Sequence, residues 1–200
     1  MLLTIASSPF TSFTRLLKSY ALSRRLNDGE KTLALIMILD FNLDFFRGAV
    51  ALVDASLEQL DGKACASPDP DTFGIFDEVE YITGFGFVAC QMYITAVVSR
   101  SRLKGKKREA LALGPMHGTG RSMAQLINAA ANHWKHSPEW SLDAPTTQAK
   151  QTLEVISSLG VDTNSSYPVA NMLHAILTPH PARFKNLIPL LTQWRDVLQR

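Results

Sequence analysis

Apolar residues recur along most of the chain at intervals of three and four, the spacing that puts them on one face of an α-helix. No stretch alternates apolar and polar residues for long enough to predict a strand. Glycine and proline interrupt the pattern and mark the ends of the predicted segments. We therefore predict an all-α helical bundle with two long central helices and several shorter ones. The predicted helices span residues 11–26, 30–60, 76–102, 121–136, 147–159, 168–177 and 186–199.

The two longest predicted helices, 30–60 and 76–102, are also the most apolar. In the first of them the polar side chains fall on one stripe, so the rest of its circumference is free to pack against neighbours. This stripe consists of Asp40, Asp44, Arg47, Asp54 and Glu58. In the second, Gly84 and Gly86 interrupt the pattern without a preceding strand. We attribute them to the close approach of neighbouring helices rather than to nucleotide binding.

Length and composition suit one folded domain over residues 1–200. The apolar share is 46% and the charged share 19%, values typical of a folded protein. A formal charge of +2 argues neither for nucleic acid nor for an anionic membrane as a partner. Basic residues cluster only locally, and we interpret this basic run as a solvated linker. It consists of Arg100, Arg102, Lys104, Lys106, Lys107 and Arg108.

Two cysteines, Cys65 and Cys90, form no Cys-x-x-Cys or Cys/His cluster, so we expect neither a disulfide framework nor a structural zinc site. This usage fits a reducing, cytoplasmic setting. The apolar stretch 33–53 carries charges in its middle, and we therefore expect no membrane-spanning helix there. We expect no cofactor.

The predicted helix 121–136 carries an unusual polar face. Asparagine in a helix interior costs roughly 0.5 kcal/mol relative to alanine. Two asparagines on consecutive turns therefore indicate specific hydrogen-bond partners. Two interpretations stay open: the face binds a ligand, or it forms a polar seam against the acidic stripe of helix 30–60. The face consists of Arg121, Gln125, Asn128, Asn132, Lys135 and His136.

This face has candidate chemistry. His136 can exchange protons near neutral pH, while Lys135 and Arg121 can stabilise developing negative charge. Asn132 can orient a ligand or the imidazole of His136. Because no cysteine or serine is paired with a base nearby, the nucleophile would have to come from the substrate, as in cleavage of RNA by its own 2′-hydroxyl. Further ligand-binding candidates are Asn128, Gln125, His133 and Glu139.

The stretch 132–136, Asn-His-Trp-Lys-His, resembles the Asn-x-x-Lys-His element of helical-bundle proteins of the HEPN superfamily. That superfamily includes metal-independent ribonucleases of toxin–antitoxin and phage-defence systems. The resemblance implies an all-α bundle, a homodimer in which two such histidines face one cleft, and RNA as a substrate. It covers these five residues. The superfamily's usual pattern of Arg, four to six residues and then His does not occur here.

Two other kinds of site are less favoured. The glycines of 114–122 precede a helix and could cradle a phosphate, but Pro115 and Arg121 stand where a P-loop needs glycine and lysine. We interpret this segment as a connector that caps the helix. A metal site at His133, His136 and Glu139 is disfavoured because Pro138 breaks the helix between the last two.

Two classes of function remain. The first is a binding or scaffold module of unassigned activity, with a possible protein partner, in which the polar face is a seam or a docking surface. The alternative is a HEPN-like metal-independent ribonuclease. The absent Arg-to-His spacing favours the first class, and the Asn-x-x-Lys-His element favours the second.

Overall fold

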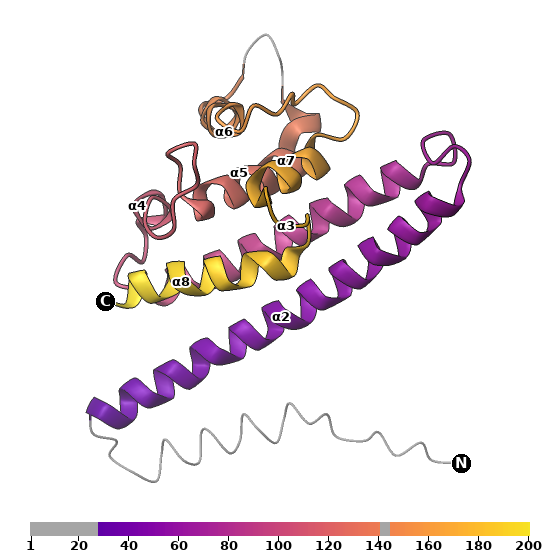
Figure 1. Cartoon of the computed structure of the whole chain (residues 1–200). Helices are drawn as coiled ribbons and strands as arrows, with labels where there is room; N and C mark the ends of the chain where they lie inside the picture. Colours follow the sequence, from indigo (N-terminus) through magenta and orange to yellow (C-terminus); the bar gives the residue numbers. More distant parts are fainter. Residues whose placement is uncertain (1–27, 141–144) are drawn as a thin grey trace, which may run out of the picture. The chain divides into compact units, whose positions relative to one another are not determined.

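The computed structural model describes the backbone of residues 28–140 and 145–200, and side chains from residue 42 onwards. It is all-α, as predicted, and no strand occurs in the described part. The predicted helix over 11–26 lies outside the described residues. The helices are α2 Asp28–Ala66, α3 Ile75–Arg100, α4 Lys107–Leu111, α5 Met123–His136, α6 Thr147–Ser157, α7 Pro168–Leu177 and α8 Leu187–Gln199, with the 3₁₀ turns η1 Ser137–Glu139 and η2 Phe184–Asn186 (Figure 1).

The chain divides into two units, residues 1–41 and 42–200. Of the first unit, only the helical backbone that begins at Asp28 is described, and α2 continues from it into the second unit. All other described elements belong to the second unit. A single domain over 1–200 stays a prediction.

Helix α3 is the centre of the second unit, where it contacts α4, α5, α7 and α8. Its side chains Phe87, Cys90 and Ile94 are completely buried. The part of α2 in this unit runs antiparallel to α3 (Figure 1). The rings of Phe46 and Tyr93 stack with their centroids 4.8 Å apart. Such burial supplies most of the stability of an apolar helix pair.

At Gly84 and Gly86, side chains from other segments closely approach the backbone of α3. A Cβ atom built on Gly84 would lie 2.1 Å from the indole nitrogen of Trp134, on α5. One built on Gly86 would lie 2.4 Å from the ring of Phe184, in η2. Both distances are far shorter than van der Waals contact. The structure thus confirms the prediction that these glycines serve close packing.

Two carboxylates of the long helices bind the starts of later segments. Asp54, on α2, accepts hydrogen bonds from the backbone amides of Phe184 and Lys185, each 2.8 Å long. Glu80, on α3, accepts hydrogen bonds of 2.7 and 2.8 Å from the amides at positions 169 and 170 in the first turn of α7. First-turn amides have no partner inside their own helix. These contacts therefore fix where η2 and α7 attach.

Some element bounds differ from the prediction for tertiary reasons. Helix α2 continues to Ala66 instead of ending near residue 60, and its last turns bind other segments through the ion pairs of Asp61 with Arg183 and of Lys63 with Glu78. Helix α5 begins at Met123 because Ser122 is its N-cap. The basic run is not merely a linker, since the short helix α4 begins within it, at Lys107.

Of the described helices, α3 alone has the length and apolar composition to cross a membrane. This is weak evidence, because the core helix of a folded protein meets the same criteria. More than half of the apolar window is buried inside the protein, which accounts for the composition of α3 without a bilayer.

We predict that Gly84→Ala and Gly48→Ala change stability in opposite directions. Gly48 lies in α2 with nothing within 4 Å of its added Cβ. Alanine there should raise the free energy of unfolding by about 0.5–1 kcal/mol, the helix preference of alanine over glycine. At Gly84 the new methyl group must displace an indole that packs against Phe85 at a centroid distance of 5.1 Å, and overpacking of this kind costs about 1–3 kcal/mol. Urea denaturation measures both variants, and a Gly84→Ala protein as stable as the wild type would contradict the packing described here.

Candidate functional site

The first turn of α5 is fixed by its own cap. The hydroxyl of Ser122 accepts a hydrogen bond from the backbone amide of Gln125, and the side-chain oxygen of Gln125 accepts one from the backbone amide of Ser122. This reciprocal pair is a capping box. The Ser122 hydroxyl also donates to the carbonyl of Leu111, at the end of α4. The start of α5 is thereby tied to α4.

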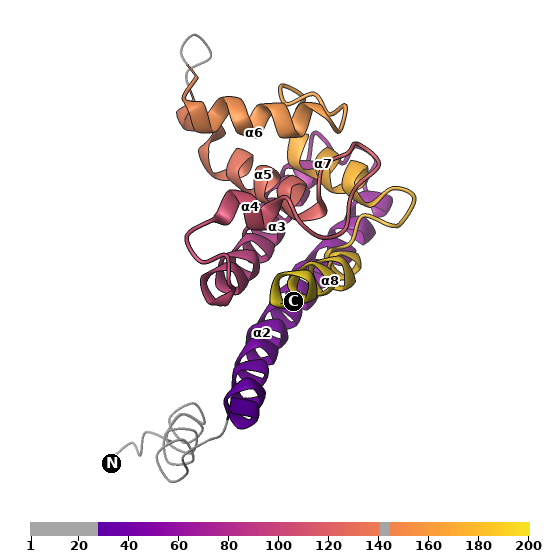
Figure 2. The same ribbon diagram turned by 90° about the vertical axis from the view of Figure 1, so that its left-hand side faces the viewer.

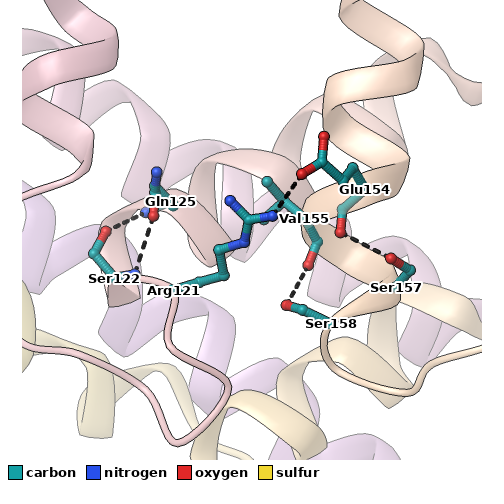
Figure 3. Close-up of polar contacts among 7 residues, drawn as sticks. All are labelled: Arg121, Ser122, Gln125, Glu154, Val155, Ser157 and Ser158. Carbon is teal, nitrogen blue, oxygen red and sulfur yellow. Dashed lines mark hydrogen bonds and ion pairs between the residues drawn. The ribbon is translucent and has the colours of Figure 1, made fainter.

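Arg121 links α5 to α6. Its guanidinium lies 2.7 Å from a carboxylate oxygen of Glu154. Figure 3 shows Arg121 extending from the segment before α5 towards Glu154, with Gln125 on the neighbouring turn of α5. The contact fixes Arg121 beside α6 and leaves the second nitrogen of its fork available.

Asn128 and Asn132 form a seam with α3. The side-chain nitrogen of Gln91 donates to the amide oxygen of Asn128 at 3.0 Å and to that of Asn132 at 2.8 Å. Gln91 is buried. The predicted seam therefore exists, but its expected partner was wrong. Asp54 of the acidic stripe instead accepts hydrogen bonds from the backbone of η2. The partner of the two asparagines is a single side-chain amide on α3, that of Gln91.

A cavity of about 370 Å³ lies between α4, α5 and α6, on the other side of these asparagines. Figure 2 shows α4 and α6 on either side of α5. Part of the predicted polar face lines the cavity. The seam is therefore observed, whereas ligand binding by this face stays a prediction. The lining residues are Lys107, Arg108, Leu111, Arg121, Gln125, Asn128, Asn132, Gln148, Gln151, Thr152, Glu154 and Val155.

Positive charge prevails in this cavity. Lys107, Arg108 and Arg121 face one carboxylate, that of Glu154, which leaves an excess of two positive charges. Burial lowers the pKa of Lys107, and the neighbouring Lys135 lowers it further. The cavity thus holds a cationic group that no described carboxylate neutralises.

His136 and Lys135, predicted as catalytic residues, do not line the cavity. The side chain of His136 is partly exposed and lies 3.4 Å from the carboxylate of Glu139, which is itself exposed. Lys135 is exposed and affects the cavity only through its charge near Lys107. Of the predicted catalytic residues, Asn132 and Arg121 line the cavity, whereas Lys135 and His136 lie in the last turn of α5 and do not. Their catalytic role stays a prediction.

His133 does not line the cavity either. It is buried, and its ring lies edge-on to Trp140 with the centroids 5.8 Å apart. Its Nδ1 atom has no hydrogen-bond partner, and burial lowers the pKa of the imidazole. His133 therefore packs in the core as a neutral aromatic ring.

The residues that close the cavity were not predicted from the sequence. Lys107 and Arg108 belong to the run interpreted as a solvated linker, and Gln148 and Gln151 belong to α6. The signals were present but weak: two uncharged amides on one face of α6, and Gln91 as the single amide in an otherwise apolar part of α3. Helical periodicity assigns such residues to faces without saying which faces meet.

A second hollow, of about 570 Å³, lies between α8 and Arg47 of α2 and contains none of the predicted site residues. Within residues 42–140 and 145–200, no group of three or more His, Cys, Asp and Glu side chains could hold a metal ion. Comparison of the chain with family models, curated proteins and solved structures found no significant match.

We predict that Gln91→Leu destabilises the protein and that His136→Ala does not. Leucine at 91 removes the donor shared by two asparagine oxygens, and unsatisfied polar groups of this kind cost about 1–3 kcal/mol. His136 has one weak contact at the surface, so its loss should change the free energy of unfolding by less than about 0.5 kcal/mol. Thermal and urea denaturation test both variants. A larger loss from His136→Ala than from Gln91→Leu would contradict the seam.

Proposed function

We propose that this protein is a helical binding module whose ligand site is the cavity between α4, α5 and α6. The observation that carries the proposal is the cavity itself, about 370 Å³ in volume and lined mainly by polar side chains. Sites for small molecules usually have volumes of roughly 300–1,000 Å³ and a few polar groups that orient the ligand. The cavity lies at the lower end of that range, which favours a compact ligand.

Four polar side chains of the cavity are held in place by contacts within the protein. Glu154 holds Arg121, the capping box holds Gln125, and Gln91 holds both asparagines. Side chains that are already ordered lose little conformational entropy on binding. This preorganisation supports a binding function over a merely solvated surface.

The HEPN-like ribonuclease stays the alternative that the sequence suggested, with RNA as its substrate. It would need His136 beside the reacting groups. Among the described contacts, His136 pairs with Glu139 outside the cavity, so no observed geometry favours this alternative over the binding module. The cytoplasmic location and a protein partner also stay predictions.

We further propose a homodimer, formed through one face of the α2–α3 pair. Leu52 and Lys63 lie on the same side of α2. Tyr81, Phe85 and Met92 lie on the side of α3 that carries Glu78. Because Lys63 and Glu78 are 3.4 Å apart, these sides belong to a single face. We call it the α2–α3 apolar face; its members and their exposed fractions are Leu52 73%, Tyr81 64%, Phe85 54% and Met92 69%.

The size of the α2–α3 apolar face suits a second copy of the chain. With ~150–250 Å² for each fully covered aromatic side chain, Tyr81 and Phe85 alone present roughly 200 Å² of surface, and Leu52 and Met92 add to it. A standard interface buries ~800 Å² per partner, of which about 65% is apolar in homodimers. The α2–α3 apolar face supplies a substantial part of that apolar area. A two-fold axis through this face would pair the two α2–α3 hairpins as a four-helix arrangement, with the same residues buried in both copies.

We predict that small polar molecules bind in the cavity and that a bulky residue placed there excludes them. The test is an NMR titration with a panel of amino acids, sugars, carboxylic acids and sugar phosphates. At least one of them should shift the side-chain amide signals of Asn128 and Asn132. Gln151→Trp should abolish the shift, because this residue lines the cavity, whereas Ser157→Trp, exposed on the same helix, should preserve it. If no member of the panel shifts these signals, the proposal fails.

We also predict that the full chain sediments as a dimer at micromolar concentration and that Met92→Lys converts it to a monomer. A lysine in the α2–α3 apolar face would bury an unpaired charge against the second copy, which is strongly unfavourable. Gln193→Lys adds the same charge at an exposed position on α8 and should leave the dimer intact. A wild-type monomer, or equal dissociation of both variants, would contradict the proposed interface.

A further inference from the structure

The amides that α5 contributes to the cavity wall present hydrogen-bond donors rather than acceptors. Asn128 and Asn132 both direct their side-chain oxygens to Gln91. The oxygen of Gln125 is likewise used, since it accepts from the backbone of Ser122. An asparagine or glutamine amide carries its oxygen and its NH₂ group on opposite sides of one carbon. The NH₂ groups of these three residues are thus the parts left for a ligand.

This arrangement depends on the direction of the hydrogen bonds of Gln91. One NH₂ group, that of Gln91, donates to both asparagines, so both must offer their oxygens to it. Turning either asparagine alone would bring two NH₂ groups together. The orientation of the pair is therefore set jointly, from inside the protein.

The positively charged groups of the wall are donors as well, and Glu154 is the one carboxylate among the lining residues. Lys107 and Arg108 are donors without acceptor capacity, and so is Arg121, whose fork is only partly used by Glu154. Burial holds the pKa of Lys107 below its usual value, as expected for a cation that lacks a counter-charge. An anion in the cavity would supply that charge and accept hydrogen bonds from the amides.

From these donors and the excess positive charge, we propose that the ligand of the cavity is a small molecule carrying a phosphate group. The inference rests on the proposed function, because it names the ligand class of the same site. Phosphate offers several acceptor oxygens at once, which matches a wall of several converging donors. A neutral sugar or amino acid would leave the excess charge unbalanced.

The ligand extends beyond its phosphate. A volume of about 370 Å³ exceeds what one phosphate group fills. The remaining lining includes the apolar side chains of Leu111 and Val155 and the neutral polar ones of Gln148, Gln151 and Thr152. This part of the wall suits a compact, uncharged portion such as a sugar. A phosphorylated sugar therefore combines the required features.

The test compares two probes that differ only in the phosphate group, ribose 5-phosphate and ribose, with inorganic phosphate as a third. Isothermal titration calorimetry and the side-chain amide signals of Asn128 and Asn132 report binding. We expect ribose 5-phosphate to bind more tightly than inorganic phosphate, and ribose to bind at least about tenfold more weakly than its phosphate, since hydrogen bonds to charged groups are the strong ones. Added salt should weaken the binding of both anions.

The matched variants are Lys107→Gln and Lys104→Gln. Both remove one charge from the basic run, but only Lys107 lines the cavity. Lys107→Gln should weaken ribose 5-phosphate binding by about tenfold, and Lys104→Gln by much less. Because Lys107 is partly buried at the start of α4, Arg108→Gln serves as a second variant at an exposed cavity position, with the same direction expected.

The outcomes separate the two proposals. Ribose binding as tightly as its phosphate, with Gln151→Trp abolishing both, would overturn the phosphate assignment while the cavity remains a binding site. Equal effects of Lys107→Gln and Lys104→Gln would overturn it as well, because the charge would then act only at long range. If anions bind but Gln151→Trp does not affect them, the binding lies elsewhere and both proposals fail.

Discussion

Helix α3 packs against other segments on several sides. Because Gly84 and Gly86 have no side chains, two of these segments can approach its backbone closely. The indole of Trp134 occupies the first gap and the ring of Phe184 the second. Through these two rings α5 and η2 are fixed against α3, and α8 follows directly from η2. The position of α5 determines the candidate site, because its polar face supplies one wall of the cavity.

Polar groups complete what the close packing begins. Asp54 and Glu80 stand on apolar helices and accept backbone hydrogen bonds from η2 and α7. Gln91 binds α5 in a similar way, but through the side chains of Asn128 and Asn132. Each of these three residues binds one later segment of the chain through hydrogen bonds to the backbone or side-chain amides of that segment. The long helices thus carry the attachment points for most of the chain that follows them.

Much of the fold followed from periodicity, whereas the site followed only in part. Helical spacing identified the long helices, the close approach at Gly84 and the polar face of α5. It could not show that α6 lies across that face, because this depends on the meeting of segments far apart in sequence. Lys107 was assigned to a linker since a charge run gives no sign of partial burial. His136 shares the angular position of Asn132 on α5, but periodicity ignores height, and the cavity ends before the last turn.

Gln91 also decides which atoms the asparagines of the cavity wall present, although Gln91 itself is not part of that wall. An asparagine amide presents either an oxygen or an NH₂ group by turning half a revolution about one bond, with no change in shape. In the proposed binding site, selectivity for the sign of a ligand's charge would therefore be encoded partly by Gln91, which lies behind the cavity wall and does not line it. Replacing the shared donor by an acceptor of equal size would favour the reversed orientation of both asparagines. In this protein, evolution could redirect ligand preference through the core helix while every lining residue stays the same.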